Sequence, residues 1–169
     1  HGRTEKNVGL VFQTPAPFPF SIYKNLTYAP VYYGIRDKKK LEKIVEEILK
    51  LTGLYEEVAG ELHKSALKLS GGQKQRLCIA RALTVEPKVL LLDEPCSSLD
   101  VKASAKIEEL LKNLKEHYTI VIVTHNLAQA KRIADDVALF QNGRLVETKD
   151  AEAFWEKPEC EETKEFLKS

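Results

Sequence analysis

The segment from Lys68 to Arg76 contains the residues best suited to bind a phosphate group. Ser70-Gly71-Gly72-Gln73 stands immediately before a stretch with the apolar spacing of a helix. A helix N-terminus offers backbone N–H groups and the positive end of the helix dipole, and two glycines let the backbone approach a bulky anion. Ser-Gly-Gly alone is more typical of an ordinary capped helix that follows a flexible turn. The continuation from Gln73 to Leu83 favours phosphate binding.

Two carboxylates form the second candidate group. Asp93 and Glu94 end the apolar run Val89–Leu92, and ligands of open α/β sheets bind beyond the carboxyl ends of strands. An acidic residue at such a place can hold Mg²⁺, usually through water, and a second one can orient and polarise an attacking water. The alternative is a solvated acidic loop. The segment Pro95–Asp100 that follows at once favours the chemical role.

Two further polar residues also follow predicted strands. His125 comes directly after Thr119–Thr124 and could contact a γ-phosphate, although a lone histidine at such a place is more often a structural capping residue. Gln13 ends the first predicted strand and could contact Mg²⁺ or the water. The roles of His125 and Gln13 are supported by their order in the sequence relative to the Ser70–Gln73 segment and the two carboxylates.

Alternating strands and helices must position these residues. Apolar, β-branched runs predict short strands at 8–12, 88–93 and 118–124, all three expected to be buried. Apolar residues at steps of three and four predict amphipathic helices at 41–51 and 101–116, and a further helix is expected at 127–134 with Asn126 as its cap. The prolines of Thr14–Phe20 exclude a helix there.

The remaining segments have clear local signals. Residues from about Ser21 to Leu83 are expected to be all-helical, with Ser21 as an N-cap and Gly53 at a helix end. Asn142-Gly143 predicts a hairpin turn between strands at 137–140 and 144–147. The tail from Asp150 to Ser169 is predicted to form two short helices interrupted at Pro158.

This order of elements predicts an α/β fold with a largely parallel sheet flanked by helices. Four parts are expected. Residues 1–20 form a core strand and the loop after it, 21–83 an inserted helical subdomain that includes Ser70–Gln73, 84–149 the α/β core, and 150–169 a helical tail.

Composition limits the classes of function. The 169 residues fit one domain, and 26 basic against 25 acidic residues give a net charge of +1, so no general attraction to nucleic acid or anionic membranes is expected. No apolar stretch approaches the roughly 18 residues needed to span a bilayer. Cys78, Cys96 and Cys160 show no metal-ligand spacing and are expected to be reduced thiols of a cytosolic protein.

Together these motifs resemble the ATP-binding subunits of ABC transporters over nearly the whole chain. Leu69–Gln73 is similar to the family's signature, Val89–Glu94 to its Walker B strand, and Ser97–Asp100 to its D-loop. The resemblance implies a P-loop NTPase core of the ABC type and ATP with Mg²⁺ as cofactors. It implies catalytic roles for Glu94, His125 and Gln13, nucleotide binding by Ser70, Gly71, Gly72, Gln73 and Asp100, and Mg²⁺ binding by Asp93 and Gln13.

A narrower resemblance is to phosphate-importer ATPases. The segments that carry it are Pro17–Asn25, Arg76–Arg81, Asp93–Ser97, Tyr118–Asn126 and Lys157-Pro158. It implies that ATP hydrolysis drives phosphate uptake by a homodimer of ATPase subunits. The homodimer would lie on the cytoplasmic face of the membrane under two transmembrane permease subunits, served by a periplasmic or extracellular solute-binding protein. The helical subdomain and the Pro/Phe loop would contact the permease, and no nucleic acid is involved.

The sequence departs from the family pattern in two places. Val101 follows Asp100 where the family usually has proline, and no Gly-x-x-x-x-Gly-Lys-Ser/Thr phosphate loop occurs in the 169 residues. The resemblance places that loop in an N-terminal part, so this fold is expected to be N-terminally truncated. We therefore expect the chain alone to be inactive as an ATPase. It could still offer Ser70–Gln73 to the nucleotide of an intact partner.

Three alternatives remain open. The first is a non-enzymatic module that binds a permease or an intact ATPase. The second is an importer subunit for another solute, because this subunit never touches the solute. The third is the ATPase head of a DNA-repair or chromosome-organising protein. A compact helical segment before Ser70, in place of a coiled coil, disfavours the third.

Overall fold

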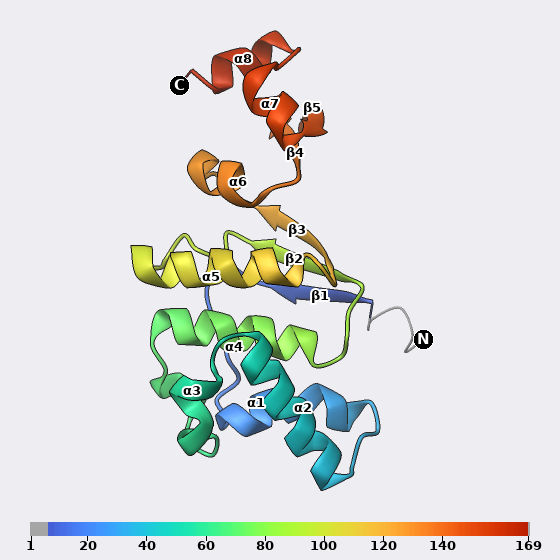
Figure 1. Cartoon of the computed structure of the whole chain (residues 1–169), viewed down its shortest axis with the longest axis vertical. Helices are drawn as coiled ribbons and strands as arrows, with labels where there is room; N and C mark the ends of the chain where they lie inside the picture. Colours follow the sequence, from blue (N-terminus) through green and yellow to red (C-terminus); the bar gives the residue numbers. More distant parts are fainter. Residues whose placement is uncertain (1–6, 169) are drawn as a thin grey trace. The chain divides into compact units, whose positions relative to one another are not determined.

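The computed structural model describes residues 7–168 and divides into two compact units. The first unit ends at Val123 and the second begins at Thr124 (Figure 1). Residues 1–6 of the expected segment 1–20 lie outside the described residues. None of the helices within 7–168 is both long enough and apolar enough to cross a membrane.

A parallel sheet forms the frame of the first unit. Its described strands are β1 (Val8–Val11), β2 (Val89–Asp93) and β3 (Thr119–Val123), hydrogen-bonded in the order β1-β2-β3. The register aligns Val11 with Leu92, and Leu92 with Ile122. Because all three strands run in the same direction, their carboxyl ends meet at one edge. The predicted α/β fold with a parallel sheet is therefore confirmed.

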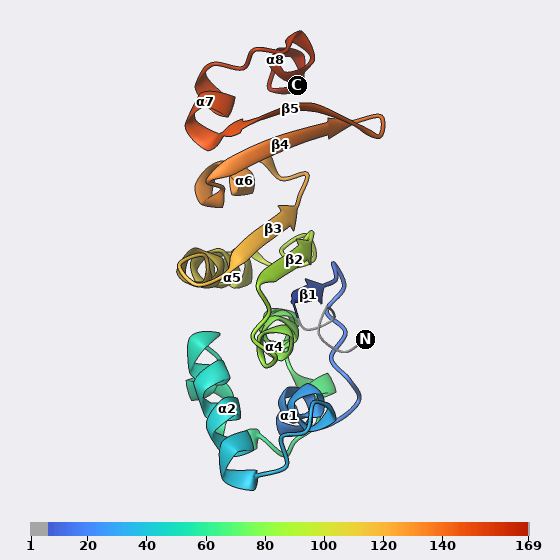
Figure 2. The same cartoon turned by 90° about the vertical axis from the view of Figure 1, so that its right-hand side faces the viewer.

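Helices α4 (Gly71–Leu83) and α5 (Val101–Leu114) lie on the same side of this sheet (Figure 2). Leu90 and Leu92 of β2 point to that side and are fully buried. On the other face Leu10 is 50% exposed and Val123 is 61% exposed. The prediction of buried strands was therefore wrong for one face of β1, and in β3 that face is exposed and the other is only half-buried. An apolar run indicates a strand, but the layers packed on the sheet decide how many of its faces are buried.

The segment between β1 and β2 is helical, as predicted. It contains α1 (Ile22–Tyr32), α2 (Lys38–Leu51), the short α3 (Tyr55–Val58) and two 3₁₀ turns, Ala59–Glu61 and Ala66–Lys68, ahead of α4. The Ser21 hydroxyl accepts a hydrogen bond from the Lys24 backbone N–H, which confirms the predicted N-cap. Gly53, which follows the C-cap Thr52 of α2, has a φ of +63°, a conformation that glycine adopts without strain.

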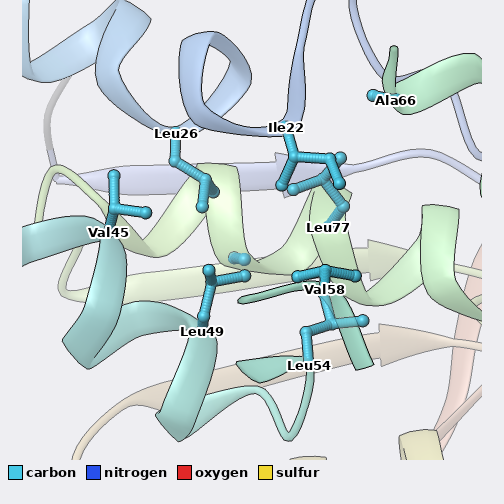
Figure 3. Close-up of a cluster of buried hydrophobic side chains, with 9 residues drawn as sticks. Ile22, Leu26, Val45, Leu49, Leu54, Val58, Ala66 and Leu77 are labelled. Carbon is cyan, nitrogen blue, oxygen red and sulfur yellow. The ribbon is translucent and has the colours of Figure 1, made fainter. Parts of the chain in front are cut away.

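One apolar cluster holds these helices together. Side chains from α1, α2, α3 and α4 meet in it and are almost completely buried (Figure 3). Leu26 of α1 and Leu49 of α2 point toward one another in this view. Leu77 of α4 belongs to the same cluster. Burial of each such leucine stabilises the fold by roughly 1.5–3 kcal/mol, so α4 is firmly attached to the helical segment.

The second unit contains a helix, a β-hairpin and the helical tail. Its elements are α6 (Leu127–Ile133), β4 (Asp136–Gln141), β5 (Arg144–Asp150), α7 (Ala151–Glu156) and α8 (Glu161–Phe166). Asn142 and Gly143 have φ angles of +49° and +76°, as expected for a two-residue hairpin turn. The hairpin, the Asn126 cap of α6 and the two short helices around Pro158 confirm the predictions for this region.

The buried Glu147 carboxylate joins the hairpin to the tail. Its oxygens accept the backbone N–H groups of Glu159 at 2.9 Å and Cys160 at 3.1 Å. The Glu159 bond is the main reason that the pKa of Glu147 falls to about 2. The segment that begins the last helix is therefore tied to β5 by a charged side chain.

Candidate functional site

The carboxyl ends of β1 and β2 bring Gln13 and Glu94 together. The Gln13 side-chain nitrogen donates to Ser97 Oγ at 3.2 Å, and Ser97 Oγ donates to the Glu94 carbonyl at 3.1 Å. Both residues follow neighbouring parallel strands, so this proximity agrees with the position predicted for them at the sheet edge. This edge is the place where ligands bind in open α/β sheets.

Glu94 has an unusual backbone conformation. Its φ is +45°, a left-handed region that costs a non-glycine residue about 1–2 kcal/mol. Its N–H donates to the Val123 carbonyl at 2.8 Å, which ties the turn to the end of β3. Strained residues of this kind are concentrated at functional sites because surrounding contacts must hold them there. The structure therefore fixes the backbone of Glu94 at the strand end.

The side chains at this edge are compatible with Mg²⁺. Asp93 is the last residue of β2 and is exposed. Gln13 uses its nitrogen to contact Ser97, so its oxygen is the atom that could face a cation. Within residues 7–168 no group of three or more His, Cys, Asp or Glu side chains is arranged to hold a metal. Mg²⁺ does not require such a group, since it keeps several waters and binds through one or two carboxylates and phosphate oxygens.

The turn before α4 presents backbone groups to solvent. The Ser70 hydroxyl accepts the Gln73 backbone N–H at 3.3 Å, and the Gln73 side-chain oxygen accepts the Ser70 backbone N–H at 2.9 Å. This reciprocal capping box starts the helix at Gly71. Ser70 and Gly71 are exposed. The first N–H groups of a helix have no intrahelical acceptor, so an anion can bind there.

Gly72 has a different environment from Gly71. It is buried, and a Cβ at this position would lie 2.8 Å from the Cβ of Ala103 in α5. At Gly71 a Cβ would make an ordinary contact with Leu99 at 3.5 Å. The close approach of α4 and α5 therefore requires a glycine at position 72. Sequence reasoning had connected both glycines with the approach of an anion.

Asp100 begins the helix that packs against Gly72. Its carboxylate accepts the Ala103 backbone N–H at 2.9 Å and so caps α5. Leu99, one residue earlier, lies against Gly71. The structure thus brings the predicted nucleotide-binding residues Ser70–Gly72 and Asp100 into one region, where the N-terminal turns of two helices meet.

His125 belongs to the second unit. It is exposed and precedes Asn126, whose side chain caps α6 by accepting the Gln129 backbone N–H at 2.9 Å. The hydroxyl of Thr124 accepts the Asn126 backbone N–H at 3.0 Å. The local structure around His125 is therefore well ordered by capping bonds, and its catalytic role stays a prediction.

Sequence reasoning missed Glu57. This residue of α3 accepts hydrogen bonds from Gln73 and Arg76 of α4 and from Lys106 of α5. The Arg76 guanidinium is the main reason that the pKa of Glu57 falls to about 2, and Lys106 and Gln73 lower it further. In the sequence, Glu56-Glu57 has the pattern of an ordinary solvated helix face. No local signal indicates partners 16 to 49 positions away.

The Pro/Phe loop at 14–20 is irregular, as predicted, but well anchored. The fully buried Asn25 side chain accepts the Phe18 backbone N–H at 2.8 Å and donates to the Phe18 carbonyl at 3.1 Å. Arg81 of α4 donates to the Ala16 carbonyl at 3.1 Å and lies over the Phe18 ring, with its guanidinium carbon 4.2 Å from the centroid. Tyr28 packs against the same ring. The loop therefore offers a fixed aromatic surface.

Comparisons with known proteins identify relatives over most of the chain. The family model of the ABC transporter matches residues 1–97. The phosphate import ATP-binding protein PstB of Borreliella burgdorferi is 52% identical over 162 residues, which is 96% of this chain and 62% of the relative. The solved structure of cbiO1 from Clostridium perfringens, part of the ABC transporter complex cbiONQ, has a TM-score of 0.78 and 32% identity. That match covers 91% of this chain and 61% of the solved one. The chain thus spans about three fifths of the length of each relative.

Replacing Gly72 with alanine should reduce the free energy of unfolding by about 1–3 kcal/mol, because the added methyl group overpacks the contact with Ala103. Gly71→Ala is the matched control. It should be neutral or stabilising, since its methyl group has room and alanine favours the helix by about 1 kcal/mol. Urea unfolding of the purified chain measures both.

A double variant isolates the contact itself. Ala103→Gly removes the methyl group that the new one would meet, so Gly72→Ala combined with Ala103→Gly should be more stable than the sum of the two single losses predicts. Additive losses would show that the requirement for glycine has another origin.

Proposed function

This chain belongs to the ABC transporter family, and we propose that it forms part of an ATP-binding subunit that couples ATP hydrolysis to the import of inorganic phosphate. The observation that carries the proposal is the connected arrangement of Gln13, Ser97 and Glu94 at the carboxyl ends of adjacent parallel strands. The 52% identity to a phosphate import ATP-binding protein supports phosphate as the solute. Activity, solute and partners are all part of this proposal.

In this proposal the strand-end residues act on ATP and water. Bound Mg²⁺ would neutralise charge on the β- and γ-phosphates. Asp93 would hold the ion through water, and Gln13 would contact the ion or the attacking water. Glu94 would orient and polarise that water as a general base. The hydrogen bond of its backbone to β3 supports this role, because a base must be held at a fixed distance from the water that it activates.

The signature turn would act on the nucleotide of a second subunit. In a homodimer of ATPase subunits, Ser70, Gly71, Gly72 and Gln73 would close on the γ-phosphate held by the partner, with Asp100 beside them. The exposed N-terminus of α4 suits this role, because its N–H groups and dipole favour negative charge. His125 would contact the γ-phosphate and respond to its presence.

The anchored Pro/Phe loop would contact one of two transmembrane permease subunits. Its aromatic side chains Phe18 and Phe20, together with Tyr28, supply an apolar surface suited to a partner helix. The subunit would then lie peripherally on the cytoplasmic face of the membrane, and a periplasmic or extracellular solute-binding protein would act through the permease. The division into parts at 1–20, 21–83, 84–149 and 150–169 belongs to the same proposal.

The 169-residue chain alone should show no ATP turnover, because no phosphate loop cradles the β- and γ-phosphates. An extended chain should gain turnover. We define it as a fusion in which the phosphate-loop segment of an ABC transporter ATP-binding subunit precedes His1. Release of inorganic phosphate from Mg²⁺-ATP measures both proteins. Turnover by the unextended chain, or none by the folded extended chain, would contradict the proposal.

Glu94→Gln in the extended chain should reduce turnover by at least about 100-fold, because the amide cannot accept a proton from water. ATP binding should remain, since the substitution preserves size and the phosphate loop is intact. Turnover is measured by phosphate release and binding by equilibrium titration with ATP. Glu86→Gln is a suitable control. Glu86 also has a positive φ but lies outside the site, so its variant should keep normal turnover.

Phosphate as the solute can be tested in cells. The extended chain should restore uptake of radiolabelled phosphate in bacteria that lack the ATPase subunit of their phosphate importer but retain its permease. The extended Glu94→Gln variant should not restore it. Normal ATP turnover without phosphate uptake in several such hosts would favour an importer for another solute.

A further inference from the structure

Glu57 receives hydrogen bonds from two different helices. Its oxygens lie 3.0 Å from the Gln73 side-chain nitrogen, 2.9 and 3.0 Å from Arg76 Nη2, and 2.9 Å from Lys106 Nζ. Gln73 and Arg76 belong to α4, and Lys106 belongs to α5. The carboxylate of the short α3 therefore connects the two helices whose N-terminal turns carry Ser70–Gly72 and Asp100.

The contact with Gln73 determines which way that amide is oriented. A carboxylate can only accept hydrogen bonds, so the NH₂ group of Gln73 must face Glu57. The amide oxygen then faces the other way and accepts the Ser70 backbone N–H at 2.9 Å. If the amide turned over, its NH₂ group would meet the Ser70 N–H, donor against donor. Glu57 thus favours the capping box that shapes the turn.

The contact with Arg76 fixes Glu57 itself. Only 6% of the Arg76 side chain is exposed, and its guanidinium donates to the Gly53 carbonyl at 2.7 Å as well as to both Glu57 oxygens. With Nη1 bonded to Gly53 and Nη2 shared between the two Glu57 oxygens, the guanidinium has little orientational freedom. The carboxylate is consequently held at a defined place relative to α4. At this place it accepts the hydrogen bond from Gln73.

We propose that Glu57 is a positioning residue for the signature turn, one that sets the orientation of Ser70–Gly72 through Gln73. The inference rests on the proposed function, in which that turn closes on a γ-phosphate. Glu57 touches neither nucleotide nor water in this scheme. Glu57 would instead determine how accurately the backbone N–H groups of the turn point at the γ-phosphate during hydrolysis.

The lowered pKa of Glu57 agrees with this geometry. Arg76, Lys106 and Gln73 are the groups that favour the charged carboxylate. With a pKa of about 2 in the folded chain against 4.5 ordinarily, the stabilisation is complete above pH 4.5 and decreases as the pH falls toward 2. The charged form of Glu57, and with it the orientation of Gln73, is therefore maintained throughout the neutral range.

The first test measures the turn without any nucleotide. In the 169-residue chain, hydrogen exchange of the Ser70 backbone amide reports the bond to Gln73, and exchange of the Leu77 amide reports global unfolding. Glu57→Gln should accelerate exchange at Ser70 by about tenfold beyond any change at Leu77, because the capping bond opens locally. The neighbouring exposed residue provides the matched control, Glu56→Gln, which should change neither.

The second test separates positioning from binding. In the extended chain, Glu57→Gln should lower kcat about tenfold and leave the KM for ATP within about twofold, because the turn acts only as the site closes. Glu57→Asp provides a second variant. It keeps a counter-charge for Arg76 but withdraws the carboxylate from Gln73, so it should fold and still show the loss in kcat. Glu56→Gln should match the wild type in both constants.

The outcomes distinguish this inference from the proposed function. Unchanged exchange at Ser70 would overturn the positioning role, and so would faster exchange with unchanged kcat, since the contact would then be purely structural. If the wild-type extended chain folded but did not hydrolyse ATP, the proposed function would fail. The exchange measurement would still decide whether Glu57 orients the turn.

Discussion

Helix α4 is confined on several sides at once, and the candidate site depends on that confinement. Leu77 is buried in the cluster of the helical segment, Ala82 lies against Gly9 of β1, and Gly72 lies against Ala103 of α5. A helix packed in this way cannot slide or rotate without opening a cavity or creating an overlap, each of which costs about 1–5 kcal/mol. Contacts made elsewhere along the helix therefore determine the position of the turn at Ser70–Gly71.

The interactions of Glu57 differ greatly in strength, and the difference determines what each can do. Arg76 is almost fully buried and is held by both carboxylate oxygens. Leaving such a charge unpaired costs about 3–5 kcal/mol. Lys106 is 57% exposed, and an exposed ion pair contributes about 0.2–1 kcal/mol. Arg76 therefore fixes α3 to α4, whereas Lys106 adds only a weak preference for the position of α5. The position of α5 comes mainly from its buried apolar face, which includes Ile107 and Leu114, and from the close contact of Ala103 with Gly72.

Local patterns in the sequence were sufficient to predict most elements and the positions of the strand-end residues. The helical spacing of Leu41–Leu51, the Asn142-Gly143 turn and the Ser21 cap each predicted the structure that is observed, because each depends on residues close in sequence. Features that depend on distant residues could not be found in this way. The one-sided burial of β1 and β3 depends on which layers pack on the sheet, and the bond of Glu57 to Lys106 joins residues 49 positions apart.

Gly72 was assigned to the correct motif, but the reason inferred for a glycine at this position was incomplete. Its place in a Ser-Gly-Gly turn suggested freedom for an approaching anion, but its side-chain space is already occupied by Ala103, 31 positions later by residue number. Of the two glycines, the exposed Gly71 remains suited to face an anion.

The loop from Pro95 to Asp100 joins the two halves of the candidate site within the first unit. At one end Ser97 is hydrogen-bonded to Gln13 and to the Glu94 carbonyl, and at the other Leu99 lies against Gly71. The loop spans only six residues and ends in the capped helix α5. The strand-end residues and the signature turn are therefore connected through this one loop. The two groups are parts of one mechanically connected structure, although the sequence presents them as separate motifs.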